Sequence, residues 1–138
     1  MIKKKILLAE DDPDDRDIMV GILSERVDID LIRSVTTGVE LIAFLEYLNQ
    51  DHQLPDLIIL DHNMPRMTGK ETLKLLKASN RYKAIPVVVF TTDSSSTFVR
   101  ECLALGAAIV ESKPESFDRY QELLNKFLGL IKNNNKEA

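Results

Sequence analysis

Four short apolar runs, each followed by a polar or charged residue, constrain the fold of this chain more than any other feature. They cover residues 6–9, 57–60, 87–90 and 107–110, and each has the length and composition of a buried β-strand. Segments with helical periodicity lie between them, and residues 29–34 add a weaker, edge-like strand. Alternating strands and helices form parallel sheets whose right-handed crossovers place helices on both faces. The sequence therefore predicts an α/β fold of five βα units around a doubly wound, five-stranded parallel sheet.

Helix boundaries are marked by capping residues and by apolar periodicity. Asp12 followed by Pro13 is typical of a helix start, and Gly106 is typical of a helix end. Ile18 in the first predicted helix and Phe117 in the last belong to the faces that we expect to cover the sheet. The predicted helices begin after Asp12 and at residues 36–38, and cover residues 69–78, 97–105 and 115–131.

Length and composition fit one domain. The chain has 138 residues, of which 44% are hydrophobic, and this is enough to form a single core. We expect this domain to cover residues 1–131. Residues 132–138 are polar, and we expect them to form a disordered tail.

Charge and hydropathy argue against nucleic-acid and membrane partners. The formal net charge of −4 leaves no basic footprint, and no apolar stretch approaches the roughly 18 residues of a membrane span. The charged N-terminus leads directly into a strand, so we expect no signal peptide. Cys102 is the only cysteine, which excludes an internal disulfide, and its spacing from Phe98 and Leu105 favours a buried structural thiol. We therefore expect a cytoplasmic protein in a reducing compartment.

The polar residues at the strand ends indicate phosphoryl chemistry. Glu10 and Asp11 follow the first run, Asp61 follows the third strand, Thr91 follows the fourth, and Lys113 comes just after the fifth. The carboxyl ends of parallel strands meet at one edge of a sheet, so these side chains can converge there. Carboxylates are ligands for Mg²⁺ and can attack phosphorus, while an ammonium and a hydroxyl can bind phosphate oxygens.

Four segments, taken in order, resemble the receiver domain of two-component response regulators. They are residues 6–13, 60–69, 90–92 and 112–114, which read ILLAEDDP, LDHNMPRMTG, FTT and SKP. The resemblance extends over residues 4–130. It implies a flavodoxin-like strand order of 2-1-3-4-5 and a stand-alone, bacterial signalling domain.

The resemblance implies a phosphoacceptor and a Mg²⁺ site. Asp61 is expected to accept the phosphoryl group and to share the metal with Asp11, which binds it directly. Glu10 would hold the metal through water, and Asn63 would bind it through its backbone carbonyl. Asn63 and Asp93 stand at the two positions that tune hydrolysis of the phosphoaspartate in this family. Both are small and polar, so we expect a phosphoryl group that is self-hydrolysed rather than long-lived.

The resemblance also implies a conformational switch, with one departure. Thr91 would move toward the phosphoryl group, and Lys113 would pair with the phosphate. The Lys113–Pro114 peptide bond is expected to be cis. The family usually carries Tyr or Phe three residues before the lysine, and this position is Val110 here. Valine cannot make the in-and-out swing of an aromatic ring, so we expect the switch to rely on Thr91 and loop packing.

A receiver of this kind is a signalling protein rather than an enzyme with an external substrate. The resemblance implies phosphorylation by a sensor histidine kinase or a histidine phosphotransfer protein. The phosphorylated protein would then bind a downstream protein target. A phosphorelay shuttle, which returns its phosphoryl group to a histidine phosphotransfer protein, would use the same residues. The resemblance also allows a homodimer.

Three other functions compete with this interpretation. A phosphatase of the haloacid dehalogenase type needs a second Asp two residues after the first, where this chain has Asn63. A phosphorylation-independent adaptor would be expected to lack Asp61, Asp11 or Lys113, and all three are present. A nucleotide- or flavin-binding domain needs a Gly-rich loop after the first strand, where residues 10–13 read EDDP.

Overall fold

The expected alternation of strands and helices is confirmed by a computed structural model that describes residues 2–92 and 95–132. The strands form one parallel sheet in the predicted order, second-first-third-fourth-fifth along the chain. They are β1 (Lys4–Ala9), β2 (Ile29–Val35), β3 (Leu57–Leu60), β4 (Val87–Thr91) and β5 (Ile109–Ser112). The helices are α1 (Pro13–Glu25), α2 (Gly38–Tyr47), the short 3₁₀ helix η1 (Asp51–Gln53), α3 (Gly69–Ala78), α4 (Ser96–Ala104) and α5 (Phe117–Leu128).

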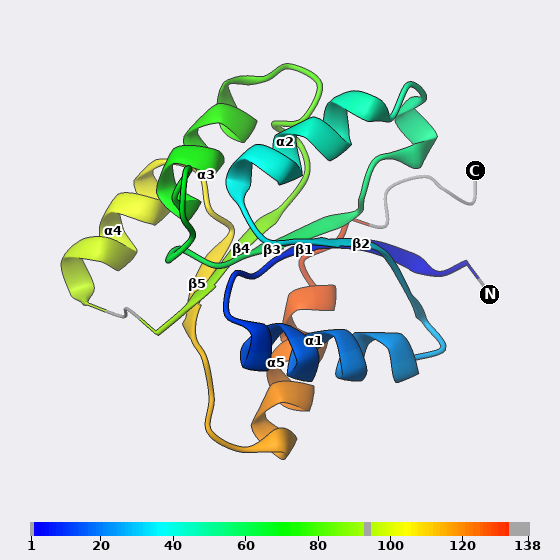
Figure 1. Cartoon of the computed structure of the whole chain (residues 1–138), viewed down its shortest axis with the longest axis vertical. Helices are drawn as coiled ribbons and strands as arrows, with labels where there is room; N and C mark the ends of the chain where they lie inside the picture. Colours follow the sequence, from blue (N-terminus) through cyan, green and yellow to red (C-terminus); the bar gives the residue numbers. More distant parts are fainter. Residues whose placement is uncertain (1, 93–94, 133–138) are drawn as a thin grey trace.

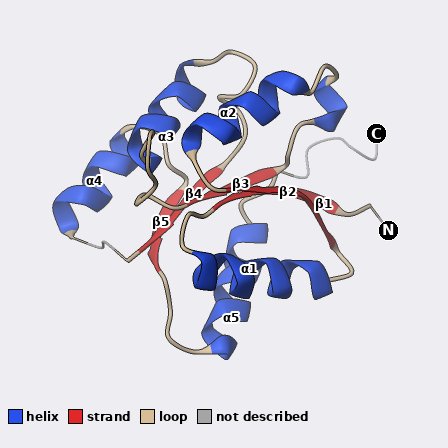
Figure 2. Ribbon diagram, viewed as in Figure 1, coloured by secondary structure: helices blue, strands red, loops and turns tan. Residues whose placement is uncertain are grey.

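Two hydrophobic cores lie on opposite faces of the sheet. Successive side chains of a strand point to opposite faces, so Ile58 and Leu60 of β3 join one core while Leu57 and Ile59 join the other. Figure 1 shows α2, α3 and α4 over one face and α1 and α5 over the other, and Figure 2 shows the sheet between these layers. All four β3 residues are buried, which explains why this strand is apolar throughout.

Each α-helix starts at the carboxyl edge of the sheet with a side-chain cap. The capping side chain accepts a hydrogen bond from the backbone N–H three residues further on, and one such cap stabilises a helix by about 1 kcal/mol. Because each of these five α-helices follows a strand, the caps place the positive ends of the helices near the strand ends. The capping residues are Asp12, Thr37, Thr68, Ser95 and Ser116.

Some details of the predicted elements are wrong. Ile18 and Phe117 were expected to face the sheet, but they are 42% and 59% exposed. The adjacent Met19 faces the core instead of Ile18, and Phe117 stands at the first position of α5, before the helix passes over the sheet. Cys102 is buried, as predicted. Residues 133–138 of the predicted tail lie outside the described residues.

Candidate functional site

The polar residues at the strand ends meet at the carboxyl edge of the sheet, as predicted. The parallel register of β1 and β3 ends both strands at the same level, so Glu10 and Asp61 follow side by side. The Asp61 backbone N–H donates to the Ala9 carbonyl at 3.0 Å, and the Lys113 backbone N–H donates to the Thr91 carbonyl at 3.0 Å. These hydrogen bonds fix the first residue of each loop relative to the neighbouring strand.

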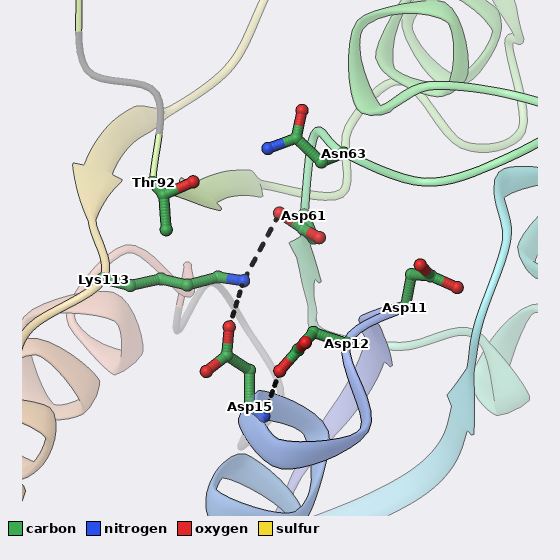
Figure 3. Close-up of a pocket in the computed structure, with 7 residues that line it drawn as sticks. All are labelled: Asp11, Asp12, Asp15, Asp61, Asn63, Thr92 and Lys113. Atoms are coloured by element: carbon green, nitrogen blue, oxygen red, sulfur yellow. Dashed lines mark hydrogen bonds and ion pairs between the residues drawn. The ribbon is translucent and has the colours of Figure 1, made fainter.

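A pocket of about 310 Å³ opens at this edge. Figure 3 shows Lys113 extending across it toward Asp61, with Asp15 on α1 approaching the same ammonium group. Four of the six residues predicted for the site line the pocket: Asp11, Asp61, Asn63 and Lys113. The complete lining is Asp11, Asp12, Asp15, Asp61, Asn63, Thr92 and Lys113.

Lys113 connects three carboxylates. Its Nζ lies 2.8 Å from Glu10 Oε1, 2.9 Å from Asp15 Oδ2 and 3.5 Å from Asp61 Oδ1. The Lys113 side chain is only 8% exposed, so these contacts are largely shielded from water. The two short contacts are charge-assisted hydrogen bonds, and the longer one is an ion pair without a hydrogen bond.

Asp61 therefore has an unused acceptor. Its Oδ1 is buried and has no hydrogen-bond partner, although the residue is only 3% exposed. A buried carboxylate oxygen without a hydrogen bond is unfavourable, and it marks a position where a cation or a donor would be stabilised. Because Asp61 lines the pocket, a small ligand entering there can reach it.

The electrostatics of the pocket are dominated by crowded negative charge. Burial raises the pKa of Glu10 to about 7, with Lys113 opposing the shift and Asp61 adding to it. For Lys113, burial acts to lower the pKa, but hydrogen bonds to Glu10 and Asp15 raise it above its ordinary value. The lysine therefore stays charged, and the carboxylates exceed it in number.

In the metal-free protein, the free energy of unfolding is expected to fall as the pH rises from about 4.5 to about 7 because of Glu10. The folded state then holds a proton that the unfolded chain has already lost, so rising pH favours unfolding. The loss is on the order of 1–3 kcal/mol. Urea denaturation of the wild type and of Glu10→Gln, in the presence of a chelator, measures it. The variant should lack this part of the pH dependence, and parallel pH profiles would contradict the prediction.

The donor set fits a Mg²⁺ ion. This ion binds proteins through one or two carboxylates and keeps water or phosphate oxygens in its remaining positions. Asp11 and Asp61 line the same pocket, and Oδ1 of Asp61 has no hydrogen-bond partner that would compete with a metal ion. Within residues 2–92 and 95–132, no group of three His, Cys, Asp or Glu is close enough to enclose a metal.

Three lining residues were not predicted as part of the site: Asp12, which was predicted only as a helix cap, Asp15 and Thr92. Asp15 contacts Lys113, and the signal that could have found it was its place one turn after the Asp12 cap. Thr92 is exposed and lines the pocket, whereas the predicted Thr91 is fully buried at the end of β4. Asp93 lies outside the described residues.

The peptide bond next to the site lysine differs from the expectation. Within the described part of the chain every peptide bond is trans, so the expected cis bond at Lys113–Pro114 is wrong. The trans form of a bond to proline is intrinsically favoured by about 0.5–1 kcal/mol, and the sequence alone does not show when a fold overrides it.

Val110 is partly buried and packs against the core beneath α4. His62 packs against Phe98 of α4 with the two rings tilted by 55° and their centroids 4.6 Å apart.

Comparison with known proteins identifies the family. The family model of the response regulator receiver domain matches residues 6–125. The chain therefore belongs to the receiver domains of two-component response regulators. Proteins of this family bind Mg²⁺ and interact with histidine kinases and phosphotransfer proteins.

Relatives and solved structures agree with this assignment. The chain is 34% identical over 110 residues to the response regulator ORR5 of Oryza sativa subsp. japonica. This match covers 79% of this chain and 77% of ORR5. It is 37% identical over 99 residues to ARR17 of Arabidopsis thaliana, covering 64% of this chain and 65% of ARR17. These relatives are plant proteins, so they do not support the expected bacterial source.

Two solved structures extend the likeness to almost the whole chain. The phosphorylated cyanobacterial phytochrome response regulator RcpA superposes with a TM-score of 0.81 at 26% identity, covering 94% of this chain and 97% of RcpA. The Mn²⁺-bound response regulator Rcp1 gives a TM-score of 0.80 at 29% identity, with the same coverage of both chains.

In the described part of this chain, no helix is long and apolar enough to cross a membrane.

Proposed function

We propose that this protein is a single-domain response regulator that accepts a phosphoryl group on Asp61 and signals by phosphorylation-dependent binding to another protein. The donor would be a sensor histidine kinase or a histidine phosphotransfer protein. The observation that carries the proposal is the buried Oδ1 of Asp61, which has no hydrogen bond, lies 3.5 Å from Lys113 Nζ and belongs to a residue that lines the pocket.

The proposed transfer is an in-line displacement at phosphorus. A carboxylate oxygen of Asp61 attacks, an O–P bond forms, and the P–N bond to the donor imidazole breaks. The imidazole leaves with the electron pair of that bond and takes up a proton. Asp61 becomes an acyl phosphate, and the attacking oxygen loses its negative charge to the new bond.

The chain's own residues orient this step and stabilise its charge. Lys113 would pair with the phosphoryl oxygens as they approach Asp61, and the Thr91 hydroxyl would donate to one of them after transfer. Asp11, Asp61, Glu10 through water and the Asn63 carbonyl would hold Mg²⁺. When bound, this ion supplies positive charge that offsets repulsion between the carboxylates and the incoming phosphoryl group.

Replacing Asp61 with Asn is expected to abolish phosphorylation, because the amide is a poor nucleophile. Intact mass would be measured after incubation with acetyl phosphate, with and without Mg²⁺, on the wild type and on Asp61→Asn. The wild type should gain one phosphoryl group (about 80 Da) only with Mg²⁺, and the adduct should decay after the donor is removed.

The control for this experiment is Asp56→Asn, which removes a carboxylate that precedes β3 and pairs with Lys5 outside the pocket. It should be phosphorylated like the wild type. A wild-type protein without an adduct, or an adduct that survives in Asp61→Asn, would favour the phosphorylation-independent adaptor.

A further inference from the structure

The ammonium group of Lys113 is bound more closely by Asp15 than by the proposed phosphoacceptor. The Asp15 contact measures 2.9 Å, against 3.5 Å for Asp61. A lysine ammonium has three N–H donors, and Glu10 and Asp15 occupy two of them with short contacts. Asp61 receives no hydrogen bond on the oxygen that faces the lysine.

The position of Asp15 is fixed by the start of α1. Its backbone N–H donates to Oδ2 of the capping residue Asp12 at 2.9 Å, so the first turn of the helix is held in place. The Asp15 side chain is 29% exposed, and it lines the same pocket as Asp61 and Lys113. Figure 3 shows its carboxylate below Lys113, on the side away from Asn63.

Only one of the three Lys113 donors remains for an incoming phosphate, so the lysine can turn more fully toward it only by giving up one of its two short contacts. A phosphoryl group that arrives at Asp61 brings its own oxygens, and these compete with the Asp15 carboxylate for the same donors. The Asp15 charge also repels the incoming anion across the pocket. Glu10 is almost fully buried and is not among the residues that line the pocket, whereas Asp15 lines it.

We infer that Asp15 is a positioning residue that holds Lys113 away from Asp61 in the unphosphorylated protein and thereby slows phosphorylation. This inference rests on the proposed function. It assigns to the first turn of α1 a role in setting how readily the site reacts, distinct from the metal-binding role of Asp11. The barrier it adds is the exchange of one charge-assisted hydrogen bond for another.

Asp15→Asn is expected to be phosphorylated by acetyl phosphate roughly three- to tenfold faster than the wild type, because the loss of a charge-assisted hydrogen bond frees Lys113. Asp15→Glu keeps the carboxylate and should return the rate to within about twofold of the wild type. The matched control is Asp14→Asn, which removes the same charge from an exposed residue of the same first turn. Its rate should follow the wild type.

Two further measurements separate positioning from a structural or metal-binding role. The NMR signal of the Lys113 ammonium in the unphosphorylated protein should move in Asp15→Asn and stay unchanged in Asp14→Asn. Titration with Mg²⁺ should give the same affinity in all four proteins. Equal rates for Asp15→Asn and Asp14→Asn would overturn the inference, and so would a slower Asp15→Asn with weakened Mg²⁺ binding. A wild type without any adduct would instead overturn the proposed function itself.

Discussion

Lys113→Met is expected to destabilise the metal-free protein by about 3 kcal/mol and to slow phosphorylation at least about 100-fold. The ammonium is the shared partner of Glu10, Asp15 and Asp61, and its side chain is 8% exposed. Its removal leaves buried carboxylates facing each other, so protonation of one of them limits the loss. Transfer slows because no fixed donor then meets the phosphoryl oxygens. Urea denaturation would measure the change in the free energy of unfolding, and intact mass during incubation with acetyl phosphate would measure the phosphorylation rate.

The matched control is Lys77→Met. Lys77 is also partly buried, but its ammonium donates to the backbone carbonyls of Lys83 and Ile85 rather than to carboxylates, and burial lowers its pKa. This variant should lose about 1–2 kcal/mol from two neutral hydrogen-bond acceptors and keep the wild-type phosphorylation rate. A Lys113→Met protein that phosphorylates like Lys77→Met would show that the lysine at the sheet edge has no part in transfer.

Gly69→Ala is expected to destabilise the protein by about 2–3 kcal/mol and to displace Asp61. A Cβ at Gly69 would stand 2.6 Å from the Asp61 carbonyl oxygen and 2.7 Å from His62 Cα. Both are backbone atoms, so no side chain can rotate to make room. The Gly69 N–H also donates to the His62 carbonyl at 3.0 Å, which ties the start of α3 to the loop after the proposed phosphoacceptor. Thermal unfolding and the phosphorylation rate should both be affected.

Gly21→Ala provides the opposite result in a comparable helix. A Cβ there would meet nothing within 4 Å, and Gly21 lies in the middle of α1. Alanine is the better helix former, so this variant should gain about 0.5–1 kcal/mol and phosphorylate normally. If Gly69→Ala were as stable as Gly21→Ala, the close approach of α3 to the Asp61 loop would not constrain the site.

The sequence predicted most of the architecture because local patterns carry it. Continuous apolar character marked β3 as buried on both faces, and Asp12–Pro13 marked the start of α1. Helix faces were less certain, since periodicity gives a stripe of residues but not its rotation against the sheet. That is why Ile18 and Phe117 were placed in the core although both are exposed.

The sequence by itself determined which residue types stand at the ends of the strands, and parallel pairing then obliged them to share one edge. Only the tertiary structure decided which of these groups touch. Lys113 donates a hydrogen bond to Asp15, 98 positions earlier in the chain, and none to Asp61 Oδ1. Such a choice depends on the docking of α1 and β5 at a resolution of about 1 Å, because hydrogen bonds weaken steeply beyond their ordinary length. No spacing along the chain carries that information.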